Sequence, residues 1–499
     1  MSKEVRRLVR LTIASLVFAC ASSAVLCAEP AARLDGRQAK NEAWLSEANK
    51  LVIDRLANSI FSCPEKIWPG WQTKGLRILI VDIPQKNAIL LSAAEPSSSE
   101  SQTPFSVAPV SYDSLSPHLK KTGLGYAYIS WPLIGRILAV HHSVSNESGI
   151  GQVVELVLHE AFHLTGQSRF GFSALTFTRG PHFPDNADLR YLRRRIIDGL
   201  RKTAQGDNRI GEIAFWVNQV RDKYGAGLNR LATLDAAEGS AEYVRFVGSS
   251  ITTLGCEAAE NVILSKALER LDSKWRDFSA QSVKSFPESE SYVIGAYSGL
   301  LLRKSGRTGW ERATENGQSM LDQLVMNVGP ESRPEDPELQ VQVNREVTAR
   351  NEFMKSRLDA LRTSLQSPER IAVSIPRARL GVLYPQYGYV TYEGESGKEI
   401  LVALGARVPT TFSLDFGTIE LREQIVQIVS QTPCGAYRQA VFSVSKDAIS
   451  EPVDGNVRIA TAGIVAELLG VSKRAHEGLQ WLCAPRESIQ TPRSKTRSD

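Results

Sequence analysis

After its first 28 residues the sequence has no long apolar run, few cysteines and little net charge. A membrane-spanning helix needs about 18 or more consecutive apolar residues, and no such stretch follows residue 28. The formal net charge is only +5 over 499 residues, so nothing indicates a nucleic-acid-binding protein. With 42% apolar and 23% charged residues, the composition is that of an ordinary globular protein and disfavours disordered, collagen-like and coiled-coil chains.

Residues 1–28 have the pattern of a secretory signal peptide. A basic stretch that ends at Arg10 precedes an apolar run, and a tolerable cleavage site lies after Ala28. Cleavage there removes four basic side chains and one acidic one, which leaves a net charge of +2. A lipoprotein acylated on Cys20 remains an alternative, although Phe18 fits such a signal poorly, and so does an uncleaved anchor, although the apolar run is short. We expect an exported protein, periplasmic or secreted, without a membrane span in the mature chain.

Four cysteines remain after the predicted cleavage: Cys63, Cys256, Cys434 and Cys483. Their spacing fits no CxxC zinc or redox motif. An even number in an oxidising compartment favours two disulfides, for which three pairings are possible. If each disulfide lies within one part of the chain, the first two cysteines pair and the last two pair.

The order of predicted strands and helices indicates an α+β fold rather than alternating βαβ units. A helical segment at 38–61 precedes strands at 76–83, 125–131 and 136–141, and a polar loop covers 92–104. Helical spacing then continues for nearly two hundred residues, over 150–165, 185–205, 210–224, 228–247, 256–273, 290–304 and 308–328.

A break rich in proline and acidic residues at 329–338 separates this helical part from the C-terminal third of the chain. We predict a first domain over 29–329, a linker and polar helix over 330–368, a smaller β-containing domain over 369–485 and a flexible tail over 486–499. The many charges of the polar helix, 339–365, suggest a solvated spacer. Strands of the second domain are expected at 371–375, 387–392, 399–404 and 439–444.

Residues 153–166 read VVELVLHEAFHLTG, an apolar helix with an HExxH motif. Positions i and i+4 lie one above the other on a helix, so the imidazoles of His159 and His163 can hold one metal ion from the same face. Glu160 is turned by about 100° from His159 and can take the proton of a water that attacks a carbonyl. The alternative is a core helix whose histidines are satisfied locally, but hiding three polar side chains on so apolar a helix costs free energy.

A hydrolytic zinc site has three protein ligands and one open position. Residues 167–171 contain no third histidine, so a downstream carboxylate is the remaining option, and residues 238–244 read EGSAEYV. Together with HExxH, this segment resembles the gluzincin branch of the zincin metallopeptidases, in which a glutamate ligand on a later helix follows the motif, often as EGxAxY. The family pattern places the ligand first, which implies Glu238. Gly239 after it would let another backbone or the substrate come close.

Glu242 lies four residues after Glu238 on the same side of the helix, so either could reach the ion. We expect Glu242 to accept a hydrogen bond from the free N–H of a ligating histidine, an arrangement that fixes the ring and raises its basicity. The alternative is a solvent-facing residue paired with Arg245.

The resemblance implies a zincin-like domain with a small sheet and many helices. It also implies a zinc cofactor held by His159, His163 and Glu238, with Glu160 as the catalytic base. A strand bordering the cleft would bind an extended peptide by β-augmentation.

Tyr243 and His182 are the candidates for a donor to the oxyanion of the transition state. The alternatives are a packed helix aromatic for Tyr243 and a surface loop residue for His182. We expect His141 and His142, at the end of a strand, to be solvated. One solvated helix face is the expectation for the basic run of Arg190, Arg193, Arg194 and Arg195.

These observations together predict an exported zinc metallopeptidase that hydrolyses peptide bonds in a peptide or protein substrate. Two alternatives remain open. One is a non-catalytic exported binding protein on a zincin scaffold, and the other is a zinc hydrolase of another amide or ester.

Overall fold

The structure is a computed structural model. It describes residues 45–93, 105–120, 122–131, 135–171, 183–225, 229–280, 287–376, 389–393, 399–404, 410–414, 417–421, 425–429, 432–435, 439–450, 456–461, 463–476 and 478–485. The predicted signal peptide with Cys20, most of the polar loop at 92–104, His182 and the predicted tail lie outside these residues. The described chain forms two compact units, an N-terminal unit within 23–177 and 188–340 and a C-terminal unit within 178–187 and 341–499.

The N-terminal unit contains a five-stranded sheet in the order β3-β2-β1-β5-β4. Its strands are β1 (Arg77–Asp82), β2 (Asn87–Ala93), β3 (Phe105–Val110), β4 (Gly125–Trp131) and β5 (Gly135–His142). The central strands β1 and β5 are parallel and rich in buried Ile, Leu and Val, whereas the other neighbouring pairs are antiparallel. The strand β4 therefore forms one edge of the sheet.

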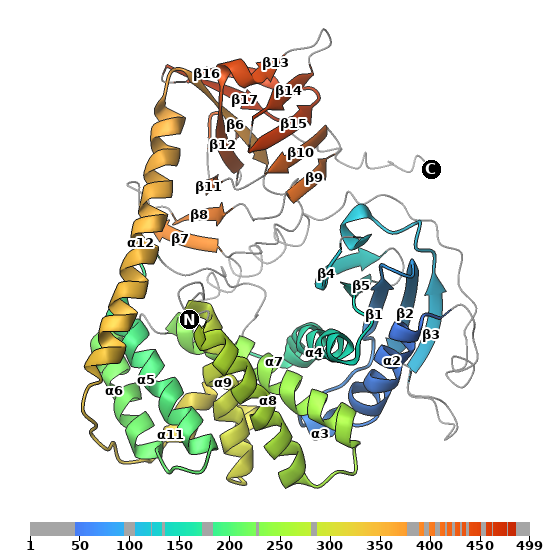
Figure 1. Ribbon diagram of the computed structural model, residues 1–499, viewed down its shortest axis with the longest axis vertical. Coiled ribbons are helices and arrows are strands. Elements are labelled where there is room, and N and C mark those ends of the chain that lie inside the picture. The colour runs from blue at the N-terminus through green and yellow to red at the C-terminus, as the bar shows by residue number, and fades with distance from the viewer. Residues whose placement is uncertain are drawn as a thin grey trace, which may run out of the picture. The chain divides into compact units, whose positions relative to one another are not determined.

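Helices make up the rest of this unit. Along the chain, α2 (Glu47–Leu56), the π-helix η2 (Ala57–Phe61) and α3 (Pro64–Ile67) precede the first strand, and the short η3 (Pro117–Lys120) lies between β3 and β4. After the sheet come α4 (Glu147–Leu164), η4 (Gly166–Arg169), α5 (Ala187–Ala204), α6 (Ile210–Tyr224), α7 (Asn229–Leu254), α8 (Glu260–Ala280), α9 (Pro287–Lys304), α10 (Trp310–Glu315) and α11 (Met320–Val325). The helix α4 packs against both β5 and α7 (Figure 1). With its strands before its main helices, the unit has the expected α+β layout.

Two local predictions differ from the structure. Strands β2 and β3, on either side of the polar loop, had not been predicted, and Pro109 interrupts the strand pattern of β3; the proline is exposed on an edge strand, where it is tolerated. The predicted helix at 308–328 is two short helices, because Gly317 has a φ of 93° and ends helical geometry between them.

The C-terminal unit contains two sheets. The first has the order β16-β17-β6-β12-β11-β8-β7 and the second β13-β14-β15-β10-β9. The strands are β6 (Arg370–Pro376), β7 (Tyr389–Glu393), β8 (Glu399–Leu404), β9 (Thr410–Leu414), β10 (Gly417–Leu421), β11 (Ile425–Val429), β12 (Gln439–Ser445), β13 (Ile449–Ser450), β14 (Val457–Ala460), β15 (Ile464–Leu468), β16 (Ser472–His476) and β17 (Leu479–Cys483), with the short η9 (Lys446–Ala448) after β12. Apolar side chains from both sheets form one buried cluster, so the two sheets share a core.

The helix α12 (Pro337–Gln366) leads into the C-terminal unit. Its expected solvation is only partly correct, because Val343, Val347, Met354 and Leu358 are buried. These residues recur at helical spacing and give α12 an apolar stripe among its charges.

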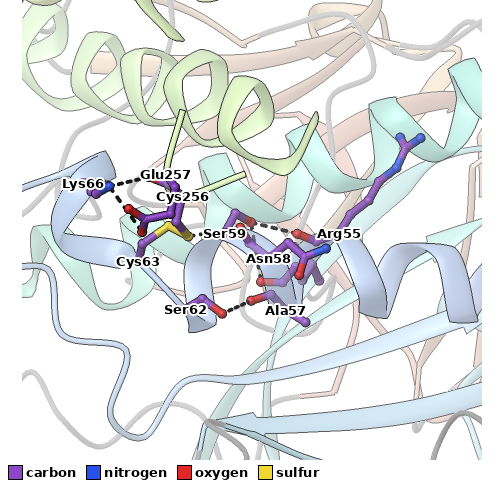
Figure 2. The surroundings of a disulfide bond; sticks show 10 residues. Arg55, Ala57, Asn58, Ser59, Ser62, Cys63, Lys66, Cys256 and Glu257 are labelled. Atoms are coloured by element: carbon purple, nitrogen blue, oxygen red, sulfur yellow. Dashed lines mark hydrogen bonds and ion pairs between the residues drawn. A yellow bond between two sulfur atoms is a disulfide. The ribbon is translucent and has the colours of Figure 1, made fainter. Parts of the chain in front are cut away.

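Two disulfides connect the cysteines in the predicted pairs. Cys63, before α3, bonds to Cys256, after α7, with a Cα–Cα distance of 6.1 Å. Figure 2 shows that Lys66 lies beside this bond, where its ammonium donates to the carbonyl of Cys256. Cys434 bonds to Cys483 at the end of β17, with a Cα–Cα distance of 5.3 Å. Each disulfide lies within one unit.

None of the helices in the described ranges combines the length and the apolar character that a bilayer span requires. The disulfides are compatible with an exported protein.

Candidate metal centre

The helix α4 carries the HExxH motif through the middle of the N-terminal unit. Its first turn is capped by Asn146, whose side chain accepts a hydrogen bond from the Gly149 backbone N–H at 2.7 Å. Apolar side chains on several sides of the helix are buried, which fixes its rotation: Ile150, Val153, Val154, Val157, Leu158, Ala161 and Phe162. The motif residues are therefore presented from a rigid element.

Three side chains meet between α4 and α7. The two Nε2 atoms of His159 and His163 lie 3.1 Å apart. Oε2 of Glu238 lies 3.4 Å from Nε2 of His159 and 3.2 Å from Nε2 of His163. All three side chains are buried, and their ligand atoms form a group that could hold a metal ion.

Gln167 determines the tautomer of His163. The amide nitrogen of Gln167 donates to the carbonyl of Ala237 and, at 2.9 Å, to the hydroxyl of Ser240, both on α7. Its amide oxygen therefore faces Nδ1 of His163, at 2.8 Å. Because that oxygen can only accept, the proton of a neutral His163 lies on Nδ1, and the lone pair of Nε2 points to Glu238.

Glu242 occupies the corresponding position behind His159. Its Oε2 lies 3.2 Å from Nδ1 of His159, while Lys274 pairs with Oε1 and Arg245 lies 3.5 Å from Oε2. Burial alone would raise the pKa of Glu242, but the charges of Lys274 and Arg245 hold it well below its usual range. The alternative of a solvent-facing Glu242 is thus wrong, since the side chain is 2% exposed, although its pairing with Arg245 is present.

The protonation of His159 reflects the density of acceptors around it. Burial alone would lower its pKa, but the carboxylates of Glu238 and Glu242, 3.4 and 3.2 Å from its ring nitrogens, together with the charge of Glu160, raise the pKa to about 9. The protonated form of His159 is therefore favoured among these carboxylates.

The side chain of Glu160 accepts a hydrogen bond from a residue on the edge strand β4. The hydroxyl of Tyr128, on β4, donates to Oε2 of Glu160 at 2.6 Å and lies 3.1 Å from the backbone carbonyl of the same residue. The guanidinium of Arg136 lies over the Tyr128 ring, 4.7 Å from its centroid.

The helix α9 closes the other side of the group. The ring of Tyr292 is stacked on His159, with centroids 5.6 Å apart and an interplanar angle of 10°. The backbones of α7 and α9 approach at two glycines, where a Cβ on Gly239 would lie 2.4 Å from Cα of Gly295. Gly239 thus permits the approach of another backbone, one of the two possibilities its sequence suggested.

The separations of the three ligand atoms are compatible with tetrahedral coordination of one metal ion. Ligands at the usual 2.0–2.2 Å from zinc lie about 3.3 Å apart when the geometry is tetrahedral, and the separations here are 3.1, 3.2 and 3.4 Å. Two imidazoles and one carboxylate are also a donor set found in hydrolytic zinc sites, which keep a fourth position open.

Tyr243 does not join this group. Five residues after Glu238, it is turned by about 140° around the helix, and its ring packs edge-on against Trp68 and Trp310. Its hydroxyl accepts a hydrogen bond from Arg303 at 2.9 Å, and burial raises the pKa of Tyr243 to about 12 against the charge of that guanidinium. The structure therefore favours the packed aromatic for Tyr243, whereas His182 lies outside the described residues.

The predicted solvated face of arginines on α5 is wrong. Arg190, Arg193 and Arg194 are buried, and all three bind Glu290 on α9. Arg193 also forms a bidentate pair with Asp235 on α7, at 2.8 and 3.1 Å. The run therefore joins three helices behind the candidate metal centre.

The predicted solvation of His141 and His142 is also wrong. The ring of His141 lies against Gly125 of β4. Nε2 of the fully buried His142 lies 3.2 Å from Oδ1 of Asn49, and burial lowers the pKa of His142 although the charge of Asp82 opposes this.

Sequence reasoning missed several contributors to the site. Gln167 could have been found, since it follows His163 by about one helical turn, although it lies in η4, just beyond the end of α4. Tyr128, Tyr292 and Lys274 come from other elements, and nothing in their local sequence distinguishes them.

No protein-family model matches the chain, and no curated protein or solved structure matches it either.

Proposed function

We propose that this chain is an exported zinc metallopeptidase of the gluzincin type. The observation that carries the proposal is the convergence of three acceptor atoms, from His159, His163 and Glu238, at separations suited to tetrahedral zinc. Gln167 and Glu242 support it, because each faces the Nδ1 atom of one histidine and so directs the Nε2 lone pair of that ring into the group.

Zinc bound in such a site acts as a Lewis acid on a substrate carbonyl and lowers the pKa of water. The protein supplies the proton transfer. Glu160 precedes His163 by three residues and is turned away from His159, so its carboxylate can take a proton from the attacking water and pass it to the leaving amine. The EGSAEYV segment at 238–244 and the HExxH motif at 159–163 are the features shared with gluzincins.

The position of β4 in its sheet supports a peptide substrate. Among the described strands β4 lies at the edge, beside β5, and Tyr128 on β4 contacts Glu160. An extended peptide that paired with β4 would pass beside the proposed base, as expected for binding by β-augmentation. The disulfides of the chain support export, since they persist in oxidising compartments.

Metal content tests the site. The mature chain, loaded with zinc and freed of excess by gel filtration, should carry about one zinc, and His159→Ala or His163→Ala should remove it, because each imidazole supplies a direct bond. Atomic absorption measures the ratio. Full occupancy in either variant would refute the assignment of the ligands.

Activity tests the reaction. The zinc-loaded chain should cleave members of a mixed fluorogenic peptide library, whereas Glu160→Gln should keep its zinc and lose cleavage, since an amide cannot take up the proton. A wild-type protein that binds zinc and cleaves no peptide would favour a binding protein, or a hydrolase of another amide or ester. Equal rates in both proteins would exclude Glu160 as the base.

A further inference from the structure

The proposed base is fixed by a residue that lies on another element. The hydroxyl of Tyr128 is 2.6 Å from Oε2 of Glu160, within the range of a hydrogen bond to an ionised carboxylate. The hydroxyl has one proton, and its distance to the backbone carbonyl of Glu160 is longer, at 3.1 Å. The carboxylate is therefore the better acceptor, and Oε1 is the oxygen left to face a reacting water.

Tyr128 is itself held in place on the sheet. Arg136 pairs with Ser130 across β4 and β5, and its guanidinium covers the face of the Tyr128 ring. The ring of Tyr126, two residues earlier on the same face of β4, packs edge-on against Tyr128 with centroids 5.8 Å apart. A hydroxyl held in this way can restrict a glutamate side chain that would otherwise sample several rotamers.

We infer that Tyr128 is the positioning residue for Glu160 in the reaction. The inference rests on the proposed function. Tyr128 holds one carboxylate oxygen so that the other meets the water in a constant geometry, and small displacements of a reacting group lower rates strongly. Because β4 is also an edge strand among the described strands, a peptide that paired with it would order the strand that carries Tyr128, which would link substrate binding to the placement of the base.

The test is Tyr128→Phe, which removes only the hydroxyl. With a peptide that the zinc-loaded wild type cleaves, kcat should fall by about 10- to 100-fold, while KM changes by less than about threefold and the bound zinc stays the same. Tyr224→Phe removes the same atom from a hydroxyl that donates to the carboxylate of Asp188 at 2.7 Å, on α6 and α5, and is the matched control, with kcat near that of the wild type. Unchanged kcat in Tyr128→Phe, or an equal loss in Tyr224→Phe, would overturn the inference.

A double variant distinguishes a positioning role of Tyr128 from a general contribution of Tyr128 to the stability of the fold. Glu160→Asp withdraws the carboxylate by one methylene group, out of reach of the Tyr128 hydroxyl, and lowers kcat by itself. Adding Tyr128→Phe to Glu160→Asp should lower kcat by less than about threefold more, because the effects of residues that act as a unit are not additive. A full 10- to 100-fold further loss would mean that Tyr128 acts elsewhere. A wild type that cleaves nothing would instead overturn the proposed function, and this inference with it.

Discussion

Gln167 and Glu242 lie on the far side of the two imidazoles from Glu238 and contact the ring nitrogens that do not face it. Each presents an oxygen to an Nδ1 atom, so each favours a proton there and, when the ring is neutral, a lone pair on Nε2. Lys274 and Arg245 keep Glu242 ionised and therefore an acceptor. The donor properties of the site thus depend on residues that would not touch a metal.

The two glutamates of EGSAEYV should differ in their effect on zinc affinity. Glu238→Ala removes a direct ligand and should nearly empty the site, whereas Glu242→Ala removes only the partner of His159 and should weaken binding by about 10- to 100-fold. Competition titration with a chromogenic chelator measures both. Glu257→Ala is the control for loss of a carboxylate, since Glu257 is exposed near the disulfide. A larger loss of zinc affinity in Glu242→Ala than in Glu238→Ala would mean that Glu242, and not Glu238, is the direct ligand.

Whether a residue of the site could be predicted from the sequence depends on how far along the chain it lies from the other residues of the site. The motif residues and Glu242 could be placed from helical periodicity alone, because residues four apart share a face. Tyr128 could not, since it lies 32 residues before Glu160 and reaches it only through the docking of β4 on α4. Tyr243 fitted the family pattern, but its ring packs against Trp68 and Trp310 on another side of α7.

At the scale of elements, the crossing of α7 and α9 brings together the two helices that carry Glu238 and Tyr292. A Cβ on Gly295 would lie 2.4 Å from both the Asp235 carbonyl oxygen and Cα of Gly239. These are backbone atoms, which cannot move aside as a flexible side chain could. The close approach therefore requires glycine on both helices.

Gly295→Ala should destabilise the N-terminal unit and weaken zinc binding. Because the Cβ would meet backbone atoms at 2.4 Å, forcing the helices apart should cost close to the upper end of about 1–3 kcal/mol, which exceeds the gain of about 1 kcal/mol from the better helix propensity of alanine. Urea unfolding measures the difference. Gly151→Ala on α4 is the matched control, because its Cβ would meet only Nη1 of Arg55 at 3.6 Å, and it should be neutral or slightly stabilising. A stabilised Gly295→Ala would contradict the tight crossing.

The arginines of α5 show why a charge pattern is ambiguous. A run of basic residues on a helix is usually solvated, and it is buried only where carboxylates distant in sequence pack against it. Glu290 lies 100 residues after Arg190, and Asp235 lies 42 residues after Arg193. The carboxylates were visible in the sequence, but their docking against α5 was not.

At the scale of the whole molecule, the helices from 150 to 304 and the strands β1, β4 and β5 were predicted from their apolar periods, although α7 and α8 each extend seven residues beyond their predicted ends. The strands β2 and β3, next to the low-complexity loop, were missed, since β2 is defined by its pairing with β1 and β3 by its pairing with β2 rather than by their own sequence patterns. The disulfide pairs were predicted correctly by assuming that each lies within one part of the chain.

Because neither disulfide connects the two units, a cut between them should separate the chain without reduction. A specific protease site inserted into the exposed segment before α12, within 329–336, would provide the cut. On a denaturing, non-reducing gel the cut protein should run as two fragments. A single band that separates only after reduction would mean that a disulfide joins the units. Insertion into the 451–455 segment, inside the ring closed by Cys434 and Cys483, is the control and should give one band until reduction.

The bond between Cys63 and Cys256 closes a covalent ring across a sequence separation of 193 residues. His159, Glu160, His163 and Glu238 all lie within that ring, as does Tyr128. In the chain-entropy view, such a closure lowers the entropy of the unfolded chain and favours the folded state by about 5 kcal/mol. Formation of this disulfide, outside the candidate metal centre, thus restricts the unfolded chain that carries the scattered donors, so that redox conditions and metal retention are linked through the stability of the fold.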